Sequence, residues 1–299
     1  MLENSSHAPR FPKLKDFGLE FDNHLRRFFA ADEKVTPRLH DAVLYSALGF
    51  GKRIRPFLVV QCCHAVGGTR EEALPPAVAV ECVHAFSLVH DDLPAMDNDD
   101  FRRGRPTTHK AFDEATAILA GDALIAMAFE VLSVHVADAQ RAVAMMRELA
   151  IGAGWMGIIG GQAADLEGQD RPASLERTRF IHDRKTASLF RAGCKMGAIA
   201  GGASPEQIDR LDDFGARAGL AFQIADDLLD VTASERELGK GVGKDLKAGK
   251  QTYPACVGIE SSQREARDLS EQAIGLLDPF GPAADGLREL ARYAVARNY

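Results

Sequence analysis

The chain has 299 residues and a formal net charge of −7, a length that permits one large domain or two small ones. The acidic balance argues against nucleic acid as a partner, because nucleic-acid-binding proteins usually carry a basic surplus. Five cysteines without a Cys-x-x-Cys pair, no signal-peptide core and no apolar run of membrane-spanning length favour a cytoplasmic chain with reduced thiols and no membrane span.

Helical periodicity dominates from about residue 17 to the end. Clusters of Gly and Pro, such as those at 67–69 and 75–76, predict turns between the helices. No linker divides the chain, so we expect a single all-α domain over 1–299. The predicted helices lie near 18–30, 37–48, 53–66, 74–92, 109–134, 138–160, 174–200, 205–230, 251–276 and 283–297.

Two glycine-containing basic segments suit an anion. Lys52 and Arg55 follow Gly51 and lie three residues apart, so they can converge on one anion at a helix start, although a solvated turn has the same composition. The loop at 239–250 contains Lys240 among several glycines. Its spacing is not that of a Walker loop, and a mobile lid and a plain loop are equally good interpretations.

A cluster of carboxylates follows the helix predicted at 74–92. Glu81, His84 and Asp91 fall on one helical stripe, and Pro94 should end the helix. The loop beyond should then carry Asp97 back toward Asp91, just before a run of arginines. A solvated acidic helix end is the simpler interpretation of this cluster taken alone.

A second acidic cluster has the spacing i, i+3, i+4, i+7, which places Gln223, Asp226, Asp227 and Asp230 on one helical face. At about 4 Å and an effective dielectric of about 20, each like-charged pair costs about 4 kcal/mol. A bound cation removes this repulsion, and Mg²⁺ is typically held by one or two carboxylates together with substrate phosphates. Two such clusters beside basic segments predict a site for metal ions and a diphosphate.

These segments together carry a family resemblance over nearly the whole chain. The chain resembles the trans-prenyltransferases (polyprenyl synthases), most closely the bacterial farnesyl diphosphate synthases. The motifs that support it, in order, are Gly51-Lys52-Arg53-Ile54-Arg55-Pro56, Asp91-Asp92-x-x-x-x-Asp97 with Arg102-Arg103-Gly104, Gly160-Gly161-Gln162-Ala163-x-Asp165, Lys185-Thr186, Phe222-Gln223-x-x-Asp226-Asp227-x-x-Asp230, Gly239-Lys240 and Gly249-Lys250-x-Thr252-Tyr253-Pro254.

The resemblance implies a fold and a reaction. The fold would be the isoprenoid synthase fold, a single-domain bundle of about ten helices around a deep central cavity, usually as a homodimer. The reaction would condense isopentenyl diphosphate with dimethylallyl or geranyl diphosphate to give farnesyl diphosphate. Ionisation of the allylic C–O bond would precede condensation and loss of a proton, with three Mg²⁺ ions assisting the diphosphate leaving group.

The resemblance also assigns roles to individual residues. Metal ions would be bound by Asp91, Asp97 and Asp226, with support from Asp92 and Asp230. Isopentenyl diphosphate would be held by Lys52, Arg55, His84 and Arg103. The allylic diphosphate would be held by Arg102, Lys185, Thr186, Gln223 and Lys240.

Product length depends in this family on residues just before the first aspartate motif. Here they are Phe86 and Ser87, five and four residues before Asp91. An aromatic residue at the first position is the short-chain bacterial pattern and favours the fifteen-carbon product. The alternatives are a geranylgeranyl or geranyl diphosphate synthase and, more remotely, a non-catalytic partner subunit that binds prenyl diphosphates. A terpene cyclase would need a different second metal motif.

Overall fold

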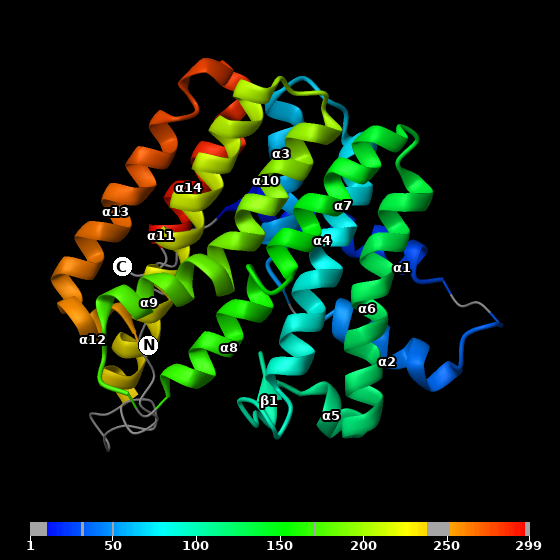
Figure 1. Cartoon of the computed structure of the whole chain (residues 1–299), viewed down its shortest axis with the longest axis horizontal. Coiled ribbons are helices and arrows are strands. Elements are labelled where there is room, and N and C mark those ends of the chain that lie inside the picture. Colours follow the sequence, from blue (N-terminus) through cyan, green and yellow to red (C-terminus); the bar gives the residue numbers. More distant parts are fainter. Residues whose placement is uncertain (1–10, 31–32, 50, 170, 238–251, 297–299) are drawn as a thin grey trace, which may run out of the picture. The chain divides into compact units, whose positions relative to one another are not determined.

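A computed structural model describes residues 11–30, 33–49, 51–169, 171–237 and 252–296, with only the backbone for 232–237. Its regular structure is almost wholly helical, which confirms the prediction of an all-α fold (Figure 1). The elements are α1 (Pro12–Phe28), α2 (Pro37–Ala47), α3 (Ile54–Ala65), α4 (Arg70–Asp91), β1 (Phe101–Arg102), β2 (Arg105–Pro106), α5 (Thr108–Ala111), α6 (Glu114–His135), α7 (Ala139–Ala153), α8 (Ile158–Gly168), α9 (Leu175–Ile181), the π-helix η1 (His182–Ala187), α10 (Ser188–Ala200), α11 (Pro205–Glu237), α12 (Tyr253–Val257), α13 (Ile259–Gly275), the 3₁₀ segment η3 (Asp278–Ala284) and α14 (Asp285–Ala296).

The chain forms two compact units. The N-terminal unit consists of Pro12–Ala150 and Lys195–Ala203, and the C-terminal unit contains Ile151–Cys194 and the chain from Ser204 onward. Helices α7 and α10 therefore contribute residues to both units. The expectation of a single domain over 1–299 stays a prediction, and each unit is described by itself.

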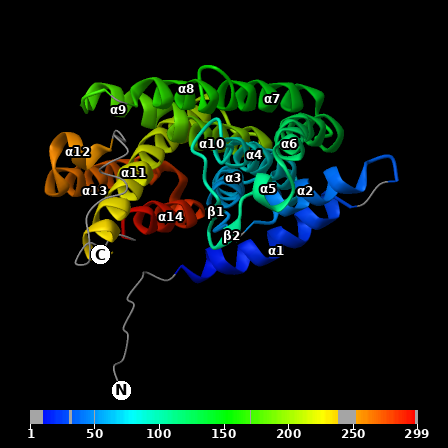
Figure 2. The same ribbon diagram turned by 90° about the horizontal axis from the view of Figure 1, so that it is seen from below.

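Helix α4 is the centre of the N-terminal unit, where it lies beside α3 and α6 (Figures 1 and 2). A capping box starts it, because Thr69 Oγ1 accepts from Glu72 N and Glu72 Oε2 accepts from Thr69 N. Pro75 and Pro76 consequently lie inside the helix, so the turn predicted at 75–76 is wrong. The cap stabilises the first turn of α4, which comes before Pro75 and Pro76, the two residues that have no backbone N–H to donate.

Close packing of α4 against α6 depends on Gly121. A Cβ atom there would lie 2.1 Å from His90 Nε2, closer than any side chain tolerates. His90 Nε2 is in turn 3.1 Å from the carbonyl oxygen of Ile118, one turn earlier on α6. The imidazole therefore lies directly between the two helix backbones.

In the C-terminal unit, α13 and α14 pack against α11 and against each other (Figures 1 and 2). The predicted helix at 251–276 is broken at Gly258, whose φ of 82° lies in the left-handed region that favours glycine. The sequence also did not predict α8 as a separate helix. Gly152 allows α7 and α10 to pack closely, since a Cβ there would lie 2.7 Å from Ala192 Cβ.

In the part of the chain that the structure describes, three helical segments are long and apolar enough to cross a membrane by length and composition, contrary to the expectation that no run reaches that length. They lie at Arg70–Asp91, Glu114–His135 and Ala139–Gly168. Burial in the protein interior explains the apolar character of Arg70–Asp91, because 78% of its most apolar window is buried inside the structure. All five cysteines are free in the structure, and only Cys256 is partly exposed.

Candidate active site

The first aspartate motif begins at the C-terminal end of α4. The amide of Asp97 donates to the carbonyl oxygen of Asp91 at 2.9 Å, so the chain turns back on itself as the sequence predicted. The turn is closed by Asn98, whose amide bonds to the Leu93 carbonyl at 3.1 Å and whose φ is 53°. Asp91 and Asp97 therefore start from linked backbone positions, which suits two carboxylates that share metal ions.

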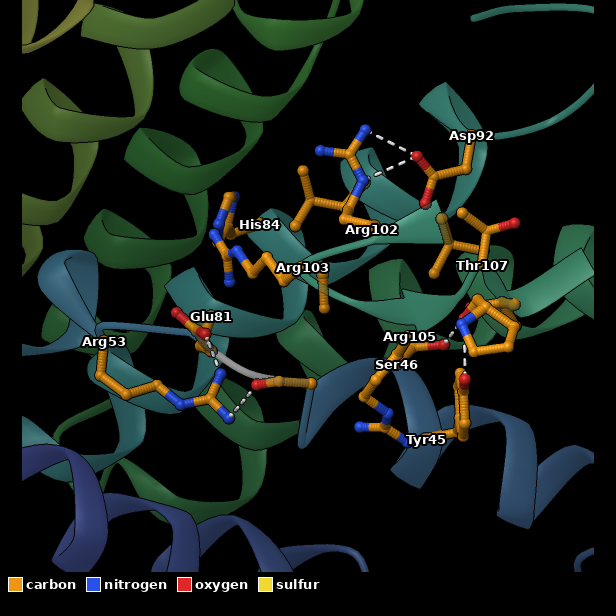
Figure 3. Close-up of a pocket in the computed structure, with 16 residues that line it drawn as sticks. Tyr45, Ser46, Arg53, Glu81, His84, Asp92, Arg102, Arg103, Arg105 and Thr107 are labelled. Atoms are coloured by element: carbon orange, nitrogen blue, oxygen red, sulfur yellow. Dashed lines mark hydrogen bonds and ion pairs between the residues drawn. The ribbon is translucent and has the colours of Figure 1, made fainter. Parts of the chain in front are cut away.

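Arg102 is held over this motif by Asp92. Its Nε and Nη2 atoms lie 2.7 and 2.6 Å from Asp92 Oδ1, and Figure 3 shows the guanidinium directed at that carboxylate. Asp92 is 3% exposed, and this burial raises the pKa of Asp92 while the hydrogen bond from Arg102 opposes the rise. The sequence predicted Asp92 as metal support and Arg102 as a ligand for the allylic diphosphate. The structure joins the two as an ion pair, and both roles stay predictions.

Arg102 and Arg103 owe their placement to a tight hairpin between β1 and β2. The central residues, Arg103 and Gly104, have φ of 52° and 76°, the positive values that a two-residue type I′ turn requires. Below the hairpin, Tyr45 donates to the Pro106 carbonyl at 2.7 Å and lies under the Arg105 guanidinium, 4.1 Å from it (Figure 3). Helix α2 thus supports the hairpin that carries the two arginines.

A pocket beside the hairpin contains His84 and Arg103, two of the residues predicted to bind isopentenyl diphosphate (Figure 3). Arg55 Nη1 lies 3.5 Å from His84 Nε2. Burial lowers the pKa of His84 well below its ordinary value, and the positive charges of Arg55 and Arg103 lower it further. The structure therefore brings together three of the four predicted residues, and the fourth, Lys52, is exposed two positions before α3. This concentration of positive charge suits an anionic ligand.

Sequence reasoning missed the residue that anchors this pocket. Arg53 is 5% exposed and adopts a left-handed conformation at the start of α3. Its guanidinium binds Glu81 of α4, Asp22 of α1 at 2.7 Å and the Gly49 carbonyl at 3.2 Å (Figure 3). Burial alone would lower the pKa of Arg53, but the carboxylates of Glu81 and Asp22 outweigh it and raise the pKa. The spacing Glu81-x-x-His84 is the sequence signal that could have pointed to Arg53. It places a possible ion-pair partner for an arginine one helical turn before His84.

Backbone space at this anchor is also limited. A Cβ atom at Gly51 would lie 2.9 Å from Arg103 Nη1. A side chain at this position would displace the end of the Arg103 side chain, so the glycine leaves room for that guanidinium beside the start of α3.

The second aspartate motif lies on α11 in the C-terminal unit. Asp226 is half-buried, Asp227 is buried and Asp230 is exposed, although one helical face carries all three. Gln223 Oε1 accepts a hydrogen bond of 2.6 Å from Thr186 Oγ1, so two residues predicted to hold the allylic diphosphate are in contact. The sequence did not predict how Asp227 differs from its neighbours.

Lys185 and Thr186 lie in η1, the π-helical segment between α9 and α10. Lys185 Nζ is 2.7 Å from Asp165 Oδ2 of α8, and a Cβ at Gly161 would lie 2.3 Å from the Lys185 backbone nitrogen. π-helical turns are rare and frequently mark functional sites. The sequence predicted one continuous helix here, because a single inserted residue leaves the apolar periodicity nearly unchanged.

The two residues predicted to limit product length lie on α4. Phe86 is 4% exposed, and its ring meets the His90 ring edge-on with centroids 5.8 Å apart. Ser87 is also buried and donates to the His84 carbonyl at 2.9 Å. Lys240, predicted to hold the allylic diphosphate, lies outside the described residues.

The donor chemistry of both motifs fits Mg²⁺. Aspartate oxygens are hard ligands, and Mg²⁺ keeps several positions for water and substrate phosphates. Among the residues that the structure describes, no group of three or more His, Cys, Asp or Glu side chains forms a ready-made metal site.

Helical bundles of the same fold have been solved as prenyltransferases. A FPP/GFPP synthase from Zymomonas mobilis has a TM-score of 0.85 and 41% identity, and the match covers 95% of this chain and 97% of that one. A geranyltransferase from Helicobacter pylori complexed with magnesium and isoprenyl diphosphate has a TM-score of 0.79 and 34% identity, over 96% and 98% of the two chains. The fold and the paired aspartate motifs thus define an all-α prenyltransferase of the isoprenoid synthase fold.

The chain belongs to the polyprenyl synthetase family, whose model matches residues 36–280. A chloroplastic geranylgeranyl pyrophosphate synthase from Catharanthus roseus is 46% identical over 269 residues, which cover 87% of this chain and 74% of that one. The predicted family is therefore confirmed. These relatives do not confirm the farnesyl product that the sequence favoured.

Proposed function

We propose that this chain condenses isopentenyl diphosphate with an allylic diphosphate in a Mg²⁺-dependent reaction. One observation carries the proposal: the turn that brings Asp97 back to Asp91 lies next to Arg102 and to the pocket of Arg103 and His84 within a single unit. Mg²⁺, when bound, would neutralise the diphosphate and make it a better leaving group. The chain's own residues would bind and orient the two substrates.

The proposed division of labour follows the geometry. Arg55, His84 and Arg103 would hold the isopentenyl diphosphate, with His84 neutral and donating a hydrogen bond. Thr186, Gln223 and Lys185 would contact the allylic diphosphate. The released proton needs no side-chain base if the departing diphosphate accepts it.

Two product lengths are proposed, in order. The geranylgeranyl product is the first candidate, because the plant relative carries that name at high coverage. The farnesyl product is the second, because the buried ring of Phe86 lies one turn before Asp91 and can stop a growing chain early. A homodimer also stays a proposal, and exposed apolar side chains on α6, at Ile118, Leu119 and Val134, support it.

The test is direct. Purified protein is incubated with Mg²⁺, isopentenyl diphosphate and dimethylallyl diphosphate, and the products are separated by carbon number after removal of the phosphates. We expect twenty- or fifteen-carbon alcohols, and no product with EDTA or with Asp91→Asn. Absence of any condensation product from the wild-type protein across allylic primers would overturn the proposal.

A further inference from the structure

Asp227 differs from the other aspartates of the second motif. It is 6% exposed, whereas Asp226 and Asp230, on the same face of α11, are more accessible. A buried carboxylate is costly unless its oxygens are paired. Its contacts with Gln223, Tyr253 and His182 lie within the C-terminal unit, and they account for its burial.

Both carboxylate oxygens of Asp227 are occupied by protein donors. Oδ2 accepts from the backbone N–H of Tyr253 at 2.7 Å, and His182 Nε2 lies 3.3 Å from the same oxygen. Oδ1 accepts from Gln223 Nε2 at 3.1 Å. A metal ion at this carboxylate would have to displace donors that are themselves buried, because Tyr253 and His182 are 1% and 4% exposed.

The contact with Tyr253 fixes the start of α12 on α11. Tyr253 follows Thr252, the N-cap of α12, and its phenol oxygen accepts from Arg179 Nη2 of α9 at 2.8 Å. Asp227 on α11 thus holds Tyr253 of α12 and His182 of η1, and Tyr253 in turn binds Arg179 of α9. Removing its charge should loosen this junction whether or not any ligand is bound.

Asp227 also sets the polarity of a hydrogen-bond chain that ends at Thr186. A carboxylate only accepts, so Gln223 must turn its Nε2 toward Asp227 and its Oε1 toward Thr186. The Thr186 hydroxyl then donates to Gln223 at 2.6 Å, so its proton is committed to Gln223 and its oxygen can only accept a further hydrogen bond. An amide in place of Asp227 offers an N–H₂ group to Gln223, which can reverse the orientation of the whole chain.

We propose that Asp227 is a positioning residue that orients Gln223 and Thr186 and anchors α12, and that it does not bind metal. The two adjacent aspartates of this motif therefore have different roles, and Asp226 remains the predicted metal ligand. The kinetic part of the proposal rests on the proposed function. The structural part does not, because it concerns contacts within the unliganded chain.

The experiment compares Asp227→Asn with Asp226→Asn in the full-length protein. In EDTA, Asp227→Asn should lower Tm by roughly 3–6 °C because a buried junction is lost. Asp226→Asn should leave Tm unchanged or raise it, since it relieves repulsion from Asp230 at i+4. When Mg²⁺ and inorganic pyrophosphate are added, Asp227→Asn should keep the stabilising shift of the wild type, and Asp226→Asn should lose it.

Kinetics supply a second readout. Asp227→Asn should raise KM for the allylic diphosphate or lower kcat at least tenfold, with the Mg²⁺ concentration for half-maximal rate and KM for isopentenyl diphosphate unchanged. Loss of the Mg²⁺-pyrophosphate shift with a normal Tm in EDTA would make Asp227 a metal ligand and overturn the proposal. Wild-type behaviour in every assay would overturn it as well.

Two further variants keep the test decisive if Asp227→Asn does not fold. His182→Gln retains a donor toward Asp227 and should behave like the wild type, whereas His182→Leu removes it and should reproduce the lower Tm in EDTA and the altered KM. Equal behaviour of the two would contradict the proposal. If the wild type forms no prenyl product, the proposed function fails, while the melting comparison in EDTA still tests the role of Asp227.

Discussion

Arg53 and Glu81 form a buried ion pair that joins the start of α3 to the middle of α4, and their side chains are 4% and 6% exposed. Arg53 directly follows Lys52, and Glu81 lies one helical turn before His84. The pair therefore connects the two segments predicted to bind isopentenyl diphosphate. The pair contributes to stability through its burial, because removal of the Glu81 charge leaves the buried Arg53 guanidinium with Asp22 as its remaining carboxylate partner.

Glu81→Gln should therefore lower the free energy of unfolding by about 1–3 kcal/mol, measured by urea denaturation. The matched control is Glu20→Gln, because Glu20 binds Arg70 on the surface with both side chains well exposed. That change should cost about 0–1 kcal/mol. Equal costs for the two variants would show that the Arg53–Glu81 contact has no special role in stability.

The low pKa of His84 predicts a pH dependence of stability. Burial lowers the pKa of His84 in the folded chain, and Arg55 and Arg103 add to the effect, so below about pH 6.5 the unfolded chain binds a proton that the folded chain does not. Stability should accordingly fall as the pH drops, by about 1.4 kcal/mol per pH unit until the folded-state pKa is reached. Urea denaturation at pH 7.5 and 5.5 should show this loss in the wild type and a smaller loss in His84→Gln.

The sequence predicted features that depend on local order and missed those that depend on distant partners. The return of Asp97 to Asp91 followed from Pro94 and the short spacing between the aspartates. The task of Asp227 did not, because its partner Tyr253 is 26 positions away and contributes a backbone N–H, which any residue but proline carries.

The sequence also does not show which side chains of a charged run are buried. A run such as Lys52, Arg53 and Arg55 does not reveal which cation turns inward, and only packing against α1 and α4 selects Arg53. The all-α fold was predictable because apolar periodicity repeats through each helix. The short β1–β2 hairpin was not, since its residues read only as a turn.

The cysteines provide a test of burial that is independent of activity. Burial raises the pKa of Cys63 to about 12 and also raises the pKa of Cys82, so neither thiol forms a thiolate near neutral pH. Only Cys256 is partly exposed. Titration with an aromatic disulfide reagent should modify at most Cys256 in the native protein and all five thiols in denaturant. Rapid reaction of two or more native thiols would contradict the described core.

Phe86→Ala tests the control of product length. The ring of Phe86 is buried beside His90, so its removal opens space one turn before Asp91. We expect products at least one five-carbon unit longer, together with a loss of about 3–5 kcal/mol in stability. Phe57→Ala is the matched control, because Phe57 is as deeply buried but packs against Phe17 of α1. It should cost similar stability and leave the product distribution unchanged. Identical product lengths from an active Phe86→Ala variant would remove Phe86 from this role.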